Sequence, residues 1–173
     1  MAPRDILVKA LLLALVAVFL GAFLWNSDQA APSIGQKIPD FELNADNGER
    51  IRPADFRGKI LVINFWATWC PPCVEEMPSL DRFQKAFAGR GVEVLAVSWD
   101  EDAKLYRDFL EQHHVRMRTV RDPGKKVGSL YGTVKIPESY IVDREGRLAR
   151  KIIGPADWMS ENMVSVFADL TGK

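Results

Sequence analysis

Cysteine is scarce in this chain of 173 residues, because Cys70 and Cys73 are its only two cysteines. A structural zinc site needs four cysteine or histidine ligands, and the only two histidines, His113 and His114, are adjacent in the sequence. Side chains of adjacent helical residues point about 100° apart, so this pair cannot readily share a metal with a distant Cys-x-x-Cys motif. The scarcity therefore argues against a structural zinc site.

An excess of charge of either sign is also absent. Lys and Arg together number 23, as do Asp and Glu, so the formal net charge is zero. The sequence shows no basic stripe interleaved with aromatic residues, no internal repeat and no low-complexity tract. With 47% hydrophobic and 27% charged residues, the composition predicts a folded protein that does not bind nucleic acid.

A long apolar run is present near the N-terminus. Residues Ile6 to Trp25 read ILVKALLLALVAVFLGAFLW, with a single charge at Lys9. A helix of this length measures about 30 Å, the thickness of the hydrocarbon core of a bilayer. The run also lacks the polar face that a buried core helix of a soluble domain would show. We therefore expect residues 1–25 to form a signal anchor, that is, a single transmembrane helix.

The charges beside this run predict its orientation. Arg4 precedes it, and the next charge after it is Asp28, so the N-terminus is expected in the cytoplasm and the following domain across the membrane. In a bacterium this places the domain in the periplasm or on the outer face of the cytoplasmic membrane. A cleaved signal peptide is the alternative, although a cut after Ala30 would put Asp28 where a small residue is required.

Residues 26–36 form a polar linker. Residues 37–173 then form a single domain, in which strand and helix patterns alternate. Apolar runs and turn signals predict strands at 40–43, 50–52, 60–66, 92–98, 118–121, 139–142 and 148–153. Helical spacing predicts helices at 72–88, 101–113, 125–131 and 158–170. Their inward residues are expected to include Met77, Leu80, Phe83 and Phe87, and then Leu105, Phe109 and Leu110. A hairpin, then β-α-β-α, then β-β-α indicates an α/β sandwich with a mixed sheet.

Both cysteines lie in residues 66–78, WATWCPPCVEEMP. A structural disulfide here would close a loop of two intervening residues, which removes little entropy from the unfolded chain and stabilises weakly. A redox couple fits better, because Cys70 falls where a predicted strand meets a predicted helix. At a helix N-terminus, unpaired N–H groups and the helix dipole favour a thiolate. Pro71 or Pro72 suits the first helical turn, where a missing N–H is harmless, and Cys73 lies about one turn further on.

The segment NFWATWCPPC resembles the active-site region of thioredoxin-fold proteins, above all the membrane-tethered TlpA/ResA-like branch. That branch includes the cytochrome c maturation thioredoxins known as CcmG or DsbE. The longer stretch IGQKIPDFELNADNGERIRPADFRGKILVINFWATWC is similar to this branch in the order of its parts. The resemblance runs from about Ile34 to the C-terminus. It implies a thioredoxin fold, a three-layer α/β/α sandwich with a mixed central sheet, extended by an N-terminal β-hairpin.

The resemblance also assigns roles to individual residues. It implies that Cys70 is the attacking thiol, Cys73 the resolving thiol, and Pro137 a proline in cis beside the disulfide. The plain alternative for Pro137 is a proline at the start of a strand. The expected substrate-binding residues are Trp66, Trp69, Pro71, Pro72 and Ile136. The extended backbone before Pro137 is expected to pair with a partner chain as an added strand.

Proton handling is expected to differ from that of ordinary thioredoxin, which has a buried aspartate where this chain has Asn64. Glu76 lies three residues after Cys73, on the same side of the predicted helix, and matches a glutamate of the ResA-like branch. Glu138 matches the Pro-Glu of the cytochrome maturation group. A carboxylate near a forming thiolate exchanges protons when burial and like charge raise its pKa. Both are predicted catalytic residues; the alternative for each is an exposed glutamate.

Together these features predict a membrane-tethered, extracytoplasmic thiol–disulfide oxidoreductase that reduces partner proteins, such as Cys-x-x-Cys-His sites of apocytochrome c. The alternatives are a general or copper-pathway reductase, an oxidant that introduces disulfides, a peroxiredoxin-like peroxidase and a non-catalytic docking module. No nicotinamide or flavin motif is present, so the Cys70–Cys73 disulfide is the only redox group expected. A membrane thiol reductant is the expected electron donor, and a monomer is the expected oligomeric state.

Overall fold

The computed structural model describes residues 3–27 and 31–172, which divide into two compact units between Ala31 and Pro32. The first unit contains helix α1 (Pro3–Ser27), so the helix predicted in this region is confirmed. Among the described residues, however, no helix is both long and apolar enough to cross a membrane, and the predicted transmembrane span is not supported. Residues 28–30 of the predicted linker, with the cleavage position considered above, lie outside the described part.

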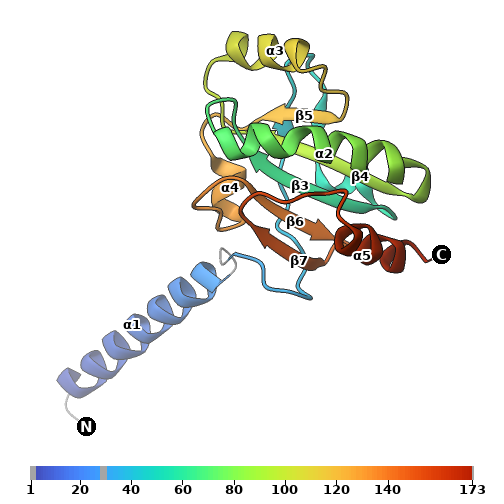
Figure 1. Ribbon diagram of the computed structural model, residues 1–173. Coiled ribbons are helices and arrows are strands. Elements are labelled where there is room, and N and C mark those ends of the chain that lie inside the picture. The colour runs from blue at the N-terminus through green and yellow to red at the C-terminus, as the bar shows by residue number, and fades with distance from the viewer. Residues whose placement is uncertain (1–2, 28–30, 173) are drawn as a thin grey trace. The chain divides into compact units, whose positions relative to one another are not determined.

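The second unit is built on a five-stranded mixed sheet with the order β5-β4-β3-β6-β7 (Figure 1). Strands β3, β4 and β5 are parallel, β6 is antiparallel to β3, and β7 is antiparallel to β6. Every residue of the central strand β3 is buried, as expected for an apolar strand covered on both faces. The predicted α/β fold with a mixed sheet is confirmed. The strands are β3 (Ile60–Trp66), β4 (Val92–Ser98), β5 (Arg118–Arg121), β6 (Glu138–Val142) and β7 (Leu148–Ile153).

Helices lie on both faces of this sheet. Because neighbouring strand residues point to opposite faces, β3 shows which elements cover each face. Trp66 packs against Phe109 of α3, on the face that also carries α2 and α5, whereas Phe65 packs against Tyr131, directly after α4. The helices are α2 (Pro71–Phe87), α3 (Ala103–Gln112), α4 (Lys126–Leu130) and α5 (Glu161–Thr171), with short 3-10 turns η1 (Pro53–Phe56) and η2 (Ala88–Arg90).

Helix α2 connects the candidate site to the core. Cys70 is its N-cap, and the two prolines occupy the first turn, where their missing N–H groups break no helical hydrogen bond. After η2, Gly91 adopts a left-handed conformation with φ of 76° and ends the segment. The predicted inward residues Met77, Leu80, Phe83 and Phe87 are all buried. Phe83 contacts Phe167 of α5, so burial of this face joins α2 to the C-terminal helix.

One inward residue of α3 was predicted wrongly. Leu105 is 61% exposed, and the adjacent Tyr106 is buried instead. The helix begins after Asp102, whose side chain caps it by accepting hydrogen bonds from the backbone N–H groups of Lys104 and Leu105. Tyr106 and Phe109 are three residues apart and both pack against Trp66 of β3, so Leu105 faces solvent.

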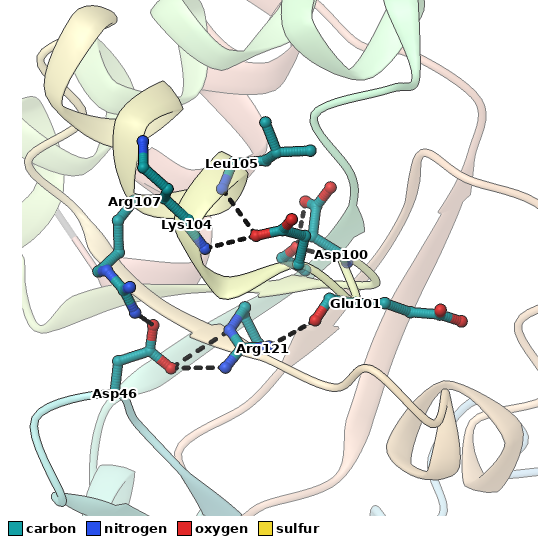
Figure 2. Close-up of polar contacts among 9 residues, drawn as sticks. Asp46, Asp100, Glu101, Lys104, Leu105, Arg107 and Arg121 are labelled. Atoms are coloured by element: carbon teal, nitrogen blue, oxygen red, sulfur yellow. Dashed lines mark hydrogen bonds and ion pairs between the residues drawn. The ribbon is translucent and has the colours of Figure 1, made fainter.

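The predicted hairpin forms, with strands shorter than predicted: β1 (Leu43–Asn44) and β2 (Arg50–Ile51). Asp46 in its turn joins the hairpin to the sheet, because its carboxylate contacts Arg107 of α3 at 3.1 Å and Arg121 of β5 at 2.9 Å (Figure 2). The Arg121 hydrogen bond, with a smaller contribution from Arg107, lowers the pKa of Asp46. The hairpin thus protects the edge strand β5, which would otherwise be open to pairing with another chain.

Candidate active site

The two cysteines form a disulfide bond between the end of β3 and the start of α2. Their Cα atoms are 5.3 Å apart, and the predicted position of Cys70 at the junction of strand and helix is confirmed. Cys70 is 6% exposed, whereas Cys73 is fully buried. A partner protein can therefore reach the sulfur of Cys70 more readily, which agrees with its predicted role as the attacking thiol.

A second loop lies beside the disulfide. The peptide bond between Ile136 and Pro137 is cis, as the family resemblance implied. The sulfur of Cys70 lies 3.8 Å from the carbonyl oxygen of Ile136, so this loop is in contact with the redox couple. Pro137 is buried and Ile136 is half-buried. The structure thus brings together the two segments that the sequence predicted to form the site.

A buried aspartate that sequence reasoning missed supports the loop before Cys70. Asp100, two residues after the end of β4, accepts hydrogen bonds from the backbone N–H of Thr68 at 3.0 Å and from its hydroxyl at 2.6 Å. It also accepts a hydrogen bond from the hydroxyl of Ser98. These bonds hold the loop between β3 and α2 against the neighbouring strand. Its position just after an apolar parallel strand, beside the strand that leads to the cysteines, was the available signal.

Glu76 is buried on the face of α2 that carries Cys73, being only 4% exposed. One carboxylate oxygen accepts a hydrogen bond from the side-chain amide of Asn64 at 2.7 Å, and the other from the backbone N–H of Ala156 at 2.9 Å. Burial raises the pKa of Glu76, although the hydrogen bonds from Ala156 and Asn64 oppose this rise. On a helix, residues three apart are neighbours, so Glu76 and Cys73 lie on the same side of α2.

A shallow groove connects Glu76 with the protein surface. Its lining includes Ser79 and Arg82 from α2, and Pro155 and Asp157 from the segment before α5. Because the groove is open to solvent, a proton on Glu76 has a short way to water. Ala156 and Asp157 come from a segment that the sequence did not connect with the site.

Glu138 lies on the other face of the sheet. Its neighbour Ser139 hydrogen-bonds to Asn64 on the α2 face, so alternation along β6 points Glu138 away from α2. Its carboxylate forms an ion pair with Lys151 at 2.8 Å and accepts a hydrogen bond from the hydroxyl of Tyr140 at 2.9 Å. Within the described residues no hydrogen bond joins Glu138 to a cysteine or to Glu76. The prediction that it handles protons for the cysteines is therefore not supported.

The predicted substrate-binding residues separate into two groups. Trp66 is fully buried and packs against Tyr106 and Phe109, so the prediction that it lines the substrate-binding surface is wrong. Its position within β3 turns its side chain into the core beneath α3. Trp69 is 59% exposed, Pro71 is exposed and Pro72 is half-buried. These three remain available to a docked protein.

Comparison with known proteins places this geometry in a family. Residues 34–151 match the AhpC/TSA family. The thiol-disulfide oxidoreductase ResA of Geobacillus kaustophilus is 31% identical over 153 residues, covering 87% of this chain and 88% of that protein. The protein of the same name from Bacillus subtilis is 29% identical over 170 residues, covering 96% and 93%.

A solved structure has the same architecture. The crystal structure of a Chlorobium tepidum protein, described as a thiol:disulfide interchange protein DsbE, superposes on this chain with a TM-score of 0.76 at 27% sequence identity. The match covers 82% of this chain and all of that one. Relatives of this kind imply disulfide-bearing protein substrates. From its disulfide, its fold and these relatives, this chain belongs to the AhpC/TSA family and is a TlpA/ResA-like thiol–disulfide oxidoreductase of the thioredoxin superfamily.

Proposed function

We propose that this protein reduces disulfide bonds of partner proteins outside the cytoplasm, and that Cys-x-x-Cys-His sites of apocytochrome c are its substrates. The substrate rests on the resemblance to the branch that contains cytochrome c maturation thioredoxins. The location rests on the same resemblance, which implies a reductant that works in an oxidising compartment. The direction of electron transfer rests on the surroundings of Cys70.

The contact between Cys70 and Ile136 supports the reductive direction. A strong disulfide-forming oxidant needs a stabilised thiolate in its reduced form. Here the carbonyl oxygen of Ile136 lies 3.8 Å from the sulfur of Cys70, and its partial negative charge disfavours a thiolate. Among the described residues, no cationic side chain hydrogen-bonds to this sulfur. The Cys70 thiolate is then stabilised by the N-terminus of α2 alone, so we expect the reduced protein to donate electrons readily.

In the proposed reaction, the thiolate of Cys70 attacks one sulfur of the partner's disulfide. A mixed disulfide forms, the partner's S–S bond breaks, and the departing sulfur takes up a proton. Cys73 then attacks the sulfur of Cys70, forming the Cys70–Cys73 bond and breaking the mixed disulfide. The second partner sulfur leaves with the electron pair and is protonated. The partner gains two electrons, and this protein is left in the disulfide form that the structure describes.

We assign the proton of Cys73 to Glu76. Cys73 is fully buried, so its thiol cannot lose a proton directly to water before it attacks. The carboxylate of Glu76, about one helical turn away, accepts that proton and releases it through the groove beside Arg82 and Asp157. A separate thiol reductant then reduces the Cys70–Cys73 bond, so the cycle needs no bound cofactor.

The proposed substrate is tested by replacing Cys73 with alanine in the full chain. This variant can form the mixed disulfide at Cys70 but cannot resolve it, so it should stay covalently bound to its partner. We expect mass spectrometry of the complexes from cells to identify apocytochrome c, joined through its haem-attachment cysteines. The Cys70→Ser, Cys73→Ala double variant is the control and should capture nothing. Capture of copper-delivery proteins, or of no thiol protein, would contradict the proposed substrate.

The role of Glu76 is tested by its glutamine variant. An ordinary glutamate has a pKa of about 4.3. Because burial raises the pKa of Glu76, its basic form becomes populated at a higher pH than that of an ordinary glutamate. Resolution of the mixed disulfide should therefore accelerate as pH rises through this pKa. In Glu76→Gln we expect this acid limb to disappear and the plateau rate to fall by about 10²-fold. Stopped-flow measurement of release of a reduced model peptide follows this step.

The adjacent Glu75→Gln is the matched control, because Glu75 is exposed and should leave both the limb and the rate intact. A Glu76→Gln variant with an unchanged acid limb would show that another group accepts the proton.

A further inference from the structure

The side-chain amide of Asn64 forms hydrogen bonds from one end only. This residue is fully buried in β3. Its nitrogen donates to a carboxylate oxygen of Glu76 at 2.7 Å and to the hydroxyl oxygen of Ser139 at 2.9 Å. Its oxygen is also buried, and no described group donates to it. A buried acceptor without a partner is uncommon, because it loses its hydrogen bonds to water without replacement.

The hydrogen bonds of this arrangement favour the ionised form of Glu76. One carboxylate oxygen receives the N–H of Asn64, and the other receives the N–H of Ala156. When Glu76 takes up a proton, it keeps acceptor capacity but also gains an O–H donor. Neither the NH₂ of Asn64 nor the N–H of Ala156 can accept a hydrogen bond from it. The proton on Glu76 therefore gains a hydrogen bond if the neighbouring amide presents its oxygen instead.

We propose that Asn64 is the positioning residue for this proton, and that its side-chain amide turns over when Glu76 becomes protonated. The oxygen and NH₂ ends of an amide have nearly the same shape, so rotation by about 180° requires no repacking. After rotation, the amide oxygen faces Glu76 and accepts the hydrogen bond from its O–H. The free end of the amide changes from oxygen to nitrogen, and the hydrogen bond to Glu76 is kept in both states. This inference rests on the proposed proton role of Glu76.

Ser139 suits both orientations. A serine hydroxyl is a donor and an acceptor, so it accepts from the amide nitrogen in one state and donates to the amide oxygen in the other. It is buried at the matching position on β6, directly paired with Asn64 in the sheet. Aspartate at position 64 would offer no donor, and leucine would offer neither group. An amide at this position serves both forms of a neighbouring carboxyl group.

Other charged groups lie near Glu76. Glu75, Arg82 and Asp157 line the groove beside it, and Cys73 precedes it on α2. Glu76 is hydrogen-bonded to Asn64 of β3, which in turn is bonded to Ser139 of β6. It is also bonded to the backbone of Ala156, in the segment before α5. None of these groups titrates. Burial, rather than these charges, raises the pKa of Glu76, and the orientation of the amide follows the proton on Glu76 itself.

The inference is tested by NMR on the oxidised full chain. The carboxyl carbon of Glu76 reports its protonation, and NOEs from the Asn64 NH₂ protons to Glu76 and Ser139 report the orientation of the amide. We expect these NOEs above the midpoint of the Glu76 titration, and their loss below it with the same midpoint. NOEs that persist while Glu76 titrates would overturn the inference, and so would a Glu76 that stays ionised at every pH at which the protein is folded.

Two variants separate this inference from the proposed function. In Glu76→Gln the pH dependence of the Asn64 signals should vanish, whereas in Glu75→Gln it should remain. If Glu76→Gln retains full reductase activity, the proposed proton role fails, whatever the amide does. If Glu76 titrates and the amide does not follow, the inference about Asn64 fails while the proton role stands.

Discussion

Replacement of Cys70 by serine is expected to lower the rate of protein disulfide reduction by about 10³-fold or more. A hydroxyl is a far poorer nucleophile than a thiolate, and the buried Cys73 cannot reach a docked partner in its place. The measurement is the rate at which the reduced protein opens a model disulfide, followed by release of free thiol.

Loss of stability must be separated from loss of chemistry in this experiment. The matched control is the reduced wild-type protein, which also lacks the Cys70–Cys73 bond. Its thermal unfolding should match that of Cys70→Ser, because sulfur and oxygen differ by little in volume. A variant that keeps most of the wild-type rate would contradict a catalytic role for Cys70 and would favour a docking module.

Replacement of Phe83 by alanine is expected to lower the free energy of unfolding by about 3–5 kcal/mol. Phe83 of α2 is fully buried where this helix packs on α5. Its ring centre lies 4.6 Å from that of Phe167 and 5.4 Å from that of Trp158. Its removal leaves a cavity that these aromatic rings cannot close without moving α5. Urea denaturation of the purified protein gives the value.

Leu105→Ala is the comparison for Phe83→Ala. Although its spacing on α3 predicted an inward side chain, Leu105 is 61% exposed, so its loss should change the free energy of unfolding by less than about 0.5 kcal/mol. A cost of several kcal/mol for Leu105→Ala would show that the original prediction was right. Equal, small effects of both substitutions would contradict the packing of α2 on α5.

The strands were more predictable than the helix faces. Ile60–Trp66 and Val92–Ser98 have the bounds that their apolar runs predicted, because a central strand buried on both faces needs an unbroken run. For α3 the pattern was ambiguous, because Leu105, Tyr106, Phe109 and Leu110 lie close together in the sequence. Leu105 and Tyr106 are both neighbours of Phe109 on the helix, and the packing of Tyr106 and Phe109 against Trp66 decides which side turns inward.

The same contrast holds for the candidate site. The cysteines and Glu76 were found because they are close in the sequence, where helical spacing is a reliable guide. Asp100 and Ala156 were not found, because they reach the site through hydrogen bonds across 32 and 80 positions of the chain. Trp66 was misjudged because nearness in sequence to Cys70 does not determine the face of the sheet on which a side chain lies.

The anchoring of Thr68 by Asp100 has a consequence for repeated turnover. Both hydrogen bonds run from the loop to the end of β4, so neither depends on the bond between Cys70 and Cys73. Opening the disulfide therefore leaves the loop attached to the sheet. A donor and a substrate then meet the same surface in turn, and little reorganisation energy is spent between the two half-reactions.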